Sequence, residues 1–416
     1  MARKMKDSGI EWIGEIPEGW EVVPVKRLCT MQAGKNLTSE QIAPEGAYPV
    51  YGGNGIRGFF SDYNCDGQFL TVGRQGALCG NVHKINGKVW ATEHAVITTP
   101  SSYAILDFLY YLLIGMDLNQ YVSSTAAQPG LAVGTLLNLK TCYPCSTLEQ
   151  TQISNYLNVK CSEINTMLSK TRSSIEEYKK LKQAVITQAI TKGVRGGREM
   201  KDSGIEWIGE IPKEWSVSPM KHFIDILPGY AFSSDDFCIE EGIPLLRGIN
   251  VGVNEIRWDE TVRWNHSISK QLESFFLKEN DLVVGLDRPW ISDGTRVAFI
   301  AKKDLPCLLL QRVCRIRTRC NFDIRWIYYW LSGSSFKDSL STETTGISVP
   351  HISTKQIEQF IIAFPTQLEQ TQICSYLDTT CAEIDKLIAK KEQLVKELES
   401  YKKSLIYEVV TGKREV

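Results

Sequence analysis

The sequence predicts an α+β protein: two mainly β domains with small helices, separated by a pair of long antiparallel α-helices that form a coiled coil. Three observations predict this fold class. They are a tandem duplication, a long apolar heptad pattern at the end of each copy, and β-like runs between turn signals in the remaining blocks. The duplication also predicts an internal pseudo-two-fold relation.

Length and composition are those of an ordinary globular protein. The chain has 416 residues, which favours two to three domains, with 43% hydrophobic and 23% charged residues. No apolar run approaches the roughly 20 residues of a membrane helix, and no apolar stretch follows the basic N-terminus as in a signal peptide. We therefore expect a cytoplasmic protein with no membrane partner. The net charge of −1 neither requires nor excludes a nucleic-acid partner.

The cysteines do not form a recognisable framework. Twelve cysteines are scattered along the chain, and no spacing repeats as in a disulfide-rich domain. Cys142 and Cys145 make a lone CxxC, without the second pair or the HxxxH that would complete a zinc site. Reduced structural cysteines are the better interpretation, and no metal site is predicted.

The duplication is visible in two stretches. Residues 5–20 (MKDSGIEWIGEIPEGW) recur at 200–215 with two mismatches. Residues 148–170, which begin LEQTQI, recur without gaps at 368–390. The first stretch has no catalytic residue pattern, and its repeated Trp, Ile and Pro residues predict packing against a repeated surface. That surface is either the helix pair or one of two identical partner subunits.

The blocks between the repeats differ from each other. Residues 21–127 and 216–348 share no useful identity and differ in length. Such a pattern predicts two different recognition domains on one repeated scaffold, whose repeated surfaces meet two copies of one partner. The predicted domains are a first recognition domain (1–147), a central long helix (148–193), a second recognition domain (194–367) and a C-terminal long helix (368–416).

Apolar heptads predict the long helices. About 42 residues without Pro or Gly, at about 1.5 Å each, give a rod on the order of 60 Å. Polar residues interrupt the two seams at matching places, Thr171 and Lys182 in the first and Lys391 and Lys402 in the second, and we expect them to tune the register. The alternative is two amphipathic helices that each lie on their own domain. The predicted seam residues are Leu157, Cys161, Ile164, Leu168, Ile175, Leu377, Cys381, Ile384, Ile388 and Val395.

The first divergent block predicts a β domain with exposed loops and one buried helix, DFLYYLLIGMDL. Its Gly53, Gly55 and Gly58 spell GxGxxG, but a dinucleotide loop needs a following helix, and here FFSDYNCDG predicts strand and turn. These glycines suit a loop whose backbone approaches a surface closely.

Polar residues on these loops are candidates for reading DNA bases. Arg pairs with guanine through two hydrogen bonds, and Asn or Gln pairs with adenine in the same way. The alternative for each residue is a solvated or turn-capping role. The candidates in the first block are Asn54, Arg57, Arg74, Gln75, Asn81 and His94.

The second divergent block offers a strand and two loops. In QRVCRIRTRC, Arg315, Arg317 and Arg319 share one strand face, which predicts either a phosphate-binding stripe or a charged edge strand that resists aggregation. The loop GLDRPWISDGTR and the segment LLRGINV supply the remaining candidates for direct readout. These are Asp287, Arg288, Trp290, Asp293 and Arg296 in the loop, and Arg247 and Asn250 in the segment.

The sequence contains no complete catalytic motif. It has no ATP-binding GxxxxGK[ST] loop, no amino-methyltransferase motif pair, no nuclease constellation and no GxSxG elbow. This favours a binding subunit. A fused restriction–methylation enzyme would need several hundred more residues, and a coiled-coil adaptor without a DNA role would not need two divergent, loop-rich domains.

Together these motifs resemble a known family. SGIEWIGEIPEGW, YPVYGGNGIRG, TVGRQGALCGNVH, KVWATEHA and LEQTQI leading into a long helix are similar to a type I restriction-modification specificity subunit. The resemblance implies two target recognition domains that each read half of a split double-stranded DNA site, and a helix pair that fixes the gap. It also implies a non-catalytic chain that binds two methyltransferase subunits and is joined by restriction (endonuclease/translocase) subunits. S-adenosylmethionine, ATP and Mg are then expected on the partner subunits, and none on this chain.

Overall fold

A computed structural model describes residues 3–75, 79–122, 130–291, 294–319, 321–340 and 351–416. The chain divides into two compact units. Unit 1 comprises Met1–Ser173 and Lys391–Val416, and unit 2 comprises Ser174–Lys390. The two long helices, α4 (Thr147–Lys192) and α8 (Gln367–Val410), each contribute residues to both units. The units therefore differ from the expected linear division, because each one takes part of both long helices.

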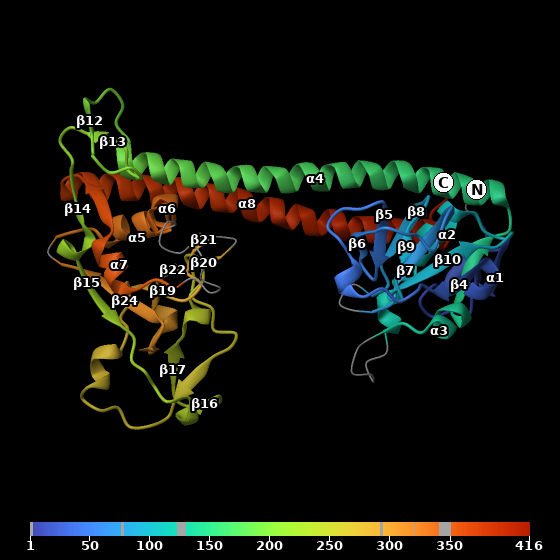
Figure 1. Cartoon of the computed structure of the whole chain (residues 1–416), viewed down its shortest axis with the longest axis horizontal. Helices are drawn as coiled ribbons and strands as arrows, with labels where there is room; N and C mark the ends of the chain where they lie inside the picture. Colours follow the sequence, from blue (N-terminus) through green and yellow to red (C-terminus); the bar gives the residue numbers. More distant parts are fainter. Residues whose placement is uncertain (1–2, 76–78, 123–129, 292–293, 320, 341–350) are drawn as a thin grey trace. The chain divides into compact units, whose positions relative to one another are not determined.

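Unit 1 is built on a four-stranded antiparallel sheet in the order β4-β10-β7-β8 (Figure 1). Its strands are β4 (Cys29–Ala33), β7 (Gln68–Gly73), β8 (Val82–Asn86) and β10 (Ala95–Pro100). The smaller sheets are β1 (Met5–Asp7) with β2 (Glu15–Pro17), β3 (Trp20–Pro24) with β11 (Lys140–Pro144), and β5 (Tyr48–Gly52) with β6 (Gly55–Phe60) and β9 (Trp90–Ala91). The short helices are α1 (Val25–Leu28), η1 (Ser39–Gln41), α2 (Leu106–Gly115), η2 (Leu118–Tyr121) and α3 (Val133–Asn138).

Unit 2 is built on a second four-stranded antiparallel sheet, in the order β15-β24-β19-β22. Its strands are β15 (Ile224–Pro228), β19 (Leu282–Gly285), β22 (Val297–Phe299) and β24 (Val313–Thr318). The smaller sheets are β12 (Met200–Asp202) with β13 (Glu210–Pro212), β14 (Ser216–Pro219) with β25 (Ile361–Phe364), β20 (Trp290–Ile291) with β21 (Gly294–Thr295), and β16 (Phe237–Cys238), β18 (Val262–Trp264), β17 (Ile243–Leu246) and β23 (Leu308–Leu309). The short helices are η3 (Met220–His222), η4 (Ser234–Asp236), η5 (Gly248–Asn250), η6 (Leu272–Phe275), η7 (Lys302–Asp304), α5 (Ile324–Ser332), α6 (Ser334–Leu340) and α7 (Thr354–Gln359).

The duplication extends into the divergent blocks. Both main sheets place their strands in the same spatial order, which is first, last, second and third along the chain. Helix α2 corresponds to α5, and each carries two adjacent tyrosines, Tyr110–Tyr111 and Tyr328–Tyr329. The two units differ in their smaller sheets, which have three strands in β6-β5-β9 and four in β16-β18-β17-β23. The expected β domains and the buried helix near residue 107 are confirmed, since Phe108 is completely buried.

The long helices pair antiparallel within each unit. In unit 1 Lys402 donates to Asn165 over 2.8 Å, and in unit 2 Lys182 donates to Asp385 over 2.7 Å. The predicted pairing is confirmed, although each helix also packs on the β domains. Both lysines belong to the predicted interruptions of the seams, and each one bonds to the opposite helix. The buried members of the predicted seam are Leu157, Cys161, Ile164, Leu168, Ile175, Leu377, Cys381 and Ile384, whereas Ile388 and Val395 are half-buried.

The repeated N-terminal stretch packs against the helix pair. In unit 1 the Tyr407 hydroxyl of α8 donates to the Trp12 carbonyl over 2.9 Å, and Trp20 Nε1 donates to Glu149 at the start of α4 over 3.0 Å. Arg3 also pairs with Glu149. Unit 2 repeats this ion pair with Arg198 and Glu369, whose atoms approach to 2.5 Å. Of the two surfaces left open by the sequence, the helix pair is therefore the one contacted within each unit.

Several cysteines are buried within the cores. Cys142 is completely buried, its Sγ lies 3.8 Å from the Val410 carbonyl, and burial raises the pKa of its thiol to about 12. Cys145 is exposed. Within the described ranges, no three His, Cys, Asp or Glu side chains cluster as metal ligands would. Of the helices in these ranges, none combines the length and apolar character needed to span a membrane.

Candidate nucleic-acid interface

Three loops of unit 1 bring most of the predicted reading residues together. Asn81, just before β8, donates from Nδ2 to Asn54 Oδ1 over 3.0 Å, and Asn54 lies in the β5–β6 turn. The backbone N–H of Arg74 donates to the His94 carbonyl over 2.9 Å. A Cβ on Gly53 would lie 2.9 Å from the Gln75 carbonyl. The β5–β6 turn therefore packs on the backbone of the other two loops.

The GxGxxG segment forms the turn and second strand of a β-hairpin, and the strand expected after it is the end of β6, not a helix. Strand β6 begins at Gly55, which has a φ of +94° that favours glycine. Arg57 lies over Gly52, because a Cβ there would be 2.4 Å from Arg57 Cδ. Arg57 is exposed, whereas Arg74 is half-buried and donates from Nε to the Leu131 carbonyl over 3.3 Å. Arg57 is thus the more accessible of these two arginines.

Two histidines accompany this cluster. His94 Nε2 lies 3.1 Å from the carboxylate of its neighbour Glu93. His83 on β8 packs beside Gly55, and its Nε2 is buried without a hydrogen-bond partner among the described residues. Burial lowers the pKa of His83, which favours the neutral ring. The sequence patterns did not single out His83 as part of this cluster. The one signal for it is that it follows the candidate Asn81 by two residues, on strand β8.

In unit 2 the β20–β21 hairpin meets the segment that contains η5. Arg296 Nη1 donates to the Gly248 carbonyl over 2.8 Å. Burial lowers the pKa of Arg296, and the positive charges of Arg288 and Arg257 lower it further. Arg288 adopts a positive φ of 45° and forms no ion pair with any described residue. The structure therefore gathers several arginines here, including Arg257, which the sequence patterns did not single out.

Arg247 and Asn250 lie beside this cluster but are held by the protein. Asn250 is 2% exposed, accepts from the Arg247 backbone N–H over 3.1 Å, and donates from Nδ2 to the Arg257 carbonyl over 2.8 Å. The prediction that Asn250 reads a base is therefore wrong, because its amide shapes the loop instead. Arg247 is half-buried and donates from its guanidinium to the Glu260 carbonyl.

Asp287 and Trp290 complete the described part of the predicted loop. Asp287 lies 2.6 Å from His351 Nδ1 and 3.6 Å from Arg312 Nε. Trp290 is half-buried with its ring centroid 6.3 Å from that of Phe336. Asp293 lies outside the described residues. Within the loop, Asp287 is engaged by His351 and Arg312, so Arg288 is better placed than Asp287 to meet a ligand.

The predicted arginine stripe on β24 is a set of internal ion pairs. Arg315 bonds to Asp225 over 2.7 Å, its side chain is 8% exposed, and burial lowers its pKa. Arg317 bonds to Asp281 through two hydrogen bonds of 2.5 and 2.7 Å, which raise its pKa. Because β24 pairs with β15 on one side and β19 on the other, it is not an edge strand either. The period-two pattern correctly placed Arg315 and Arg317 on one face, but Arg315 is buried there and is not accessible to a phosphate. Arg317 is half-buried, and Arg319, just after β24, is exposed and lies 4.0 Å from Asp225.

Comparison with known proteins shows which family has this architecture. The type I restriction modification DNA specificity domain matches residues 17–177 and 212–397, once in each copy of the duplication. The MjaVIII type I restriction enzyme specificity subunit of Methanocaldococcus jannaschii is 27% identical over 415 residues, which cover 96% of this chain and 93% of that protein. The EcoAI specificity subunit of Escherichia coli is 36% identical over 191 residues, or 44% of this chain and 32% of that protein.

A solved structure shares the fold. A chain from a study of complex assembly and conformational transition of a type I R-M system superposes with a TM-score of 0.68 at 14% identity, covering 96% of this chain and 99% of that one. Since the family match spans more than half of the residues and occurs twice, the chain belongs to the type I restriction-modification DNA specificity family.

Proposed function

We propose that the chain is the DNA sequence-recognition subunit of a type I restriction-modification complex and is not itself catalytic. Each divergent domain reads one half of a split DNA site, and the helix pair sets the unread gap. The observation that carries this proposal is that two main sheets with the same strand order bear different small sheets and loops. A repeated scaffold with different loops suits one chain that must read two different sequences.

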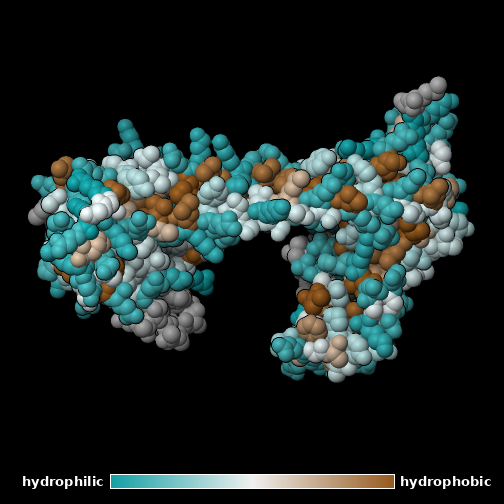
Figure 2. Space-filling model, turned by 90° about the horizontal axis from the view of Figure 1, so that it is seen from above, coloured by the Kyte–Doolittle hydropathy of each residue, from teal (hydrophilic) through white to brown (hydrophobic). Residues whose placement is uncertain are grey.

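The same chain would dock two methyltransferase subunits through its repeated helix surfaces. Exposed apolar residues recur at equivalent positions, once in each unit. Leu148 is 68% exposed in unit 1 and its counterpart Leu368 is 71% exposed in unit 2, and Met167 (53%) corresponds to Leu387 (41%). Hydrophobic residues are visible between hydrophilic ones along the long helices in Figure 2. Repeated apolar exposure supports two copies of one partner, because an interface has to bury it.

The chemistry would then belong to the partners. Methyltransferase subunits would use S-adenosylmethionine to methylate adenine, and restriction subunits would use ATP and Mg to translocate and cleave unmodified DNA. The chain would be required for both activities and would act in the cytoplasm.

Mapping of methylated adenines tests the proposal. The chain is expressed with its methyltransferase subunit in a host that lacks other adenine methylation, and modified bases are mapped by single-molecule sequencing. One split motif with a fixed gap is expected. A contiguous motif, or no methylation when the partner is active with another specificity subunit, would contradict the proposal and favour a structural adaptor.

A further inference from the structure

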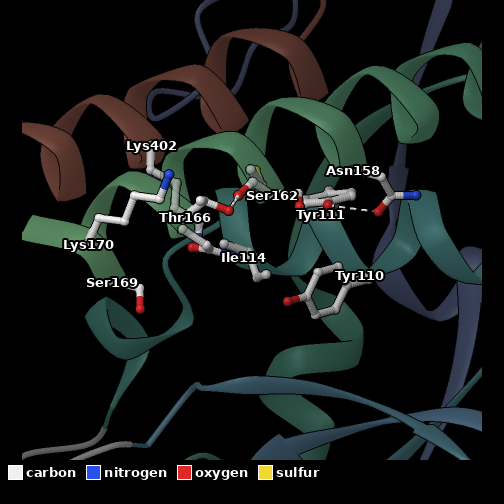
Figure 3. A pocket seen from close by; sticks show the side chains of 11 residues that line it. Tyr110, Tyr111, Ile114, Asn158, Ser162, Thr166, Ser169, Lys170 and Lys402 are labelled. Atoms are coloured by element: carbon white, nitrogen blue, oxygen red, sulfur yellow. Dashed lines mark hydrogen bonds between the residues drawn. The ribbon is translucent and has the colours of Figure 1, made fainter. Parts of the chain in front are cut away.

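Each unit contains a groove where its two-tyrosine helix meets the long helices. In unit 1 the groove has a volume of about 590 Å³ and lies between α2, α4 and α8 (Figure 3). In unit 2 the corresponding groove has a volume of about 600 Å³ and includes α5. Tyr111 donates to Asn158 over 2.8 Å in the first groove, and Tyr329 donates to Asp378 over 2.5 Å in the second. The duplication has therefore produced two grooves of the same design.

The two grooves differ in charge. In unit 2 Lys182 is neutralised by Asp385, since Nζ lies 2.7 Å from both carboxylate oxygens. In unit 1 the corresponding Lys402 meets the neutral amide of Asn165. Figure 3 shows Lys402 on α8 near Lys170 on α4, and Lys170 forms no ion pair within the described ranges. None of the described residues that line the unit 1 groove is acidic, whereas unit 2 has Asp323, Asp378 and Asp385.

Most of the uncharged side chains that line the unit 1 groove, apart from Ile114 and Cys161, are hydroxyls and amides that can donate hydrogen bonds to an anion. Amides and hydroxyls stand beside the two ammonium groups, among them Asn165, Ser162 and Ser169. In unit 2 the positions equivalent to these three are Asp385, Ala382 and Ala389. Ammonium, amide and hydroxyl donors are the groups that contact DNA phosphates in proteins.

The unit 1 groove continues toward the candidate reading loop. A second cavity of about 550 Å³ shares Ile114 with the groove and is lined by Asn81 and Lys403. Asn81 is the residue bonded to Asn54 in the reading cluster. Lys403 forms no ion pair within the described part of the chain, and its counterpart in the other copy is Gln183. Lys170, Lys402 and Lys403 thus lie along the two adjoining cavities that lead to the loop.

We infer that the unit 1 groove binds a phosphate of the DNA backbone beside the half-site read by the first domain, and that the unit 2 groove does not. This inference rests on the proposed function. Two copies of one methyltransferase subunit would need the same chemistry in both units, and the grooves do not provide it. At about 100° per residue, Asn158 and Asn165 lie on nearly the opposite face of α4 from Met167, one of the exposed apolar residues of the repeated surface. The two asparagines of the groove therefore lie away from Met167.

Salt-dependent DNA binding tests the inference on the complex of the chain with its methyltransferase subunits. The probe is a duplex that carries the motif found by methylation mapping. Lys170→Gln combined with Lys402→Gln should weaken binding several-fold at low salt and make the slope of log K against log salt less negative by about 0.9 per lost phosphate contact. The preference for the motif over a scrambled duplex should not change, because phosphates carry no sequence information.

Two further variants separate a loss of DNA binding from a loss of folding. Asn165→Asp copies unit 2 and should lower affinity like the double variant while keeping the bond to Lys402. The matched control is Lys390→Gln, the unit 2 counterpart of Lys170, which should leave the slope unchanged. An unchanged slope in both unit 1 variants, with motif binding intact, overturns the inference. Loss of the methyltransferase subunit at an unchanged slope also overturns it and assigns the groove to the partner. If the unaltered complex does not bind its motif, the proposed function itself fails.

Discussion

A single buried glutamine in each copy explains why the LEQTQI sequence is repeated. Gln150 is completely buried, donates from Nε2 to the Tyr103 and Pro144 carbonyls over 2.8 and 3.0 Å, and accepts from the Ile105 N–H over 2.9 Å. Gln370 likewise donates to the Pro365 carbonyl over 3.0 Å and accepts over 3.2 Å from the N–H that precedes α5. One side chain thus pairs backbone groups at a strand end and a helix start, which would be costly to leave unpaired when buried.

Single residues of the reading clusters should change one half-site each. Asn81→Ala removes a donor from the unit 1 cluster, and Arg288→Ala removes an arginine of the unit 2 cluster that forms no ion pair with any described residue. We expect Asn81→Ala to relax a base in the first half-site and Arg288→Ala to relax one in the second, each by about 1–3 kcal/mol of discrimination. Methylation mapping of each variant checks this. Relaxation of both half-sites by one variant would contradict it, and Arg319→Ala, outside the cluster, serves as the control.

His83 should make stability sensitive to pH. Burial lowers its pKa in the folded state below the unfolded value of about 6.5. The unfolded chain therefore binds the proton first as the pH falls, so this contribution to stability is present above about pH 6.5 and is lost below it. Melting temperatures between pH 7.5 and 5.5 should fall less steeply for His83→Gln than for the unaltered chain. His266→Gln, at an exposed histidine, is the control, and parallel curves for all three proteins would refute the prediction.

At the scale of elements, the repeated N-terminal stretch of each copy packs against the C-terminal end of a long helix, and a glycine makes this contact possible. Gly412 follows α8 with a φ of +71°, and a Cβ there would lie 2.4 Å from Pro17 Cγ. Gly193 follows α4 with a φ of +75° and faces Trp215. Glycine ends these helices in a left-handed conformation and leaves room for the repeated stretch.

Gly412→Ala should therefore destabilise the chain by about 2 kcal/mol or more, from the left-handed backbone and the contact with Pro17. Gly19→Ala is the matched control, because a Cβ at Gly19 meets no atom within 4 Å. Thermal unfolding of the two variants measures the difference. Equal melting temperatures would show that the contact tolerates a side chain.

The long helices were the elements best predicted from the sequence. The predicted central helix, 148–193, corresponds to Thr147–Lys192 in the structure, because a heptad pattern repeated over many turns leaves little ambiguity. The environment of the β-strands was harder to predict. A period-two pattern shows which residues share one face of a strand, but it does not show whether other parts of the protein bury that face. For that reason the sequence leaves Arg315 and Arg317 open between a phosphate-binding stripe and a charged edge strand, and gives Asn250 only as a candidate for a base contact. The shared strand order of the two main sheets could not be predicted from the sequence either. A buried core restricts the size and polarity of its side chains more than their identity, so the two copies can keep one fold without keeping similar residues.

The repeated apolar surfaces give a prediction for partner docking. Leu148→Asp and Leu368→Asp each place a charge on a surface that an interface would bury. We expect each single variant to retain one methyltransferase subunit and the double variant to retain none, as measured by native mass spectrometry of the purified complex. Ile239→Asp is the control, since Ile239 is 80% exposed and lies outside the repeated stretches. Two subunits retained by the double variant would exclude this surface as the docking site.

At the scale of the whole molecule, the two copies of the duplication exchange the ends of their long helices. Helix α8, from the second copy, ends in the core of unit 1, and helix α4, from the first copy, ends in the core of unit 2. Leu405, Ile406, Val409 and Val410 of α8 are buried in the core of unit 1. Ile190 near the end of α4 is buried in the core of unit 2. The two copies are therefore interdependent, and neither divergent domain has a complete core without helix residues from the other copy.

This interdependence suggests how the gap in the DNA site could be altered without changing either reading domain. Inserting four residues after Arg172 in α4, matched by four in the facing part of α8 near Val395, lengthens both helices by about 6 Å and adds little more than one turn to each. Since base pairs are about 3.4 Å apart, the methylated motif should keep both half-sites and gain one or two base pairs of gap. Insertion in α4 alone is the control, because it shifts one side of the antiparallel seam against the other and should reduce stability. Altered half-site sequences in the matched variant would refute the idea that the helices act as a spacer.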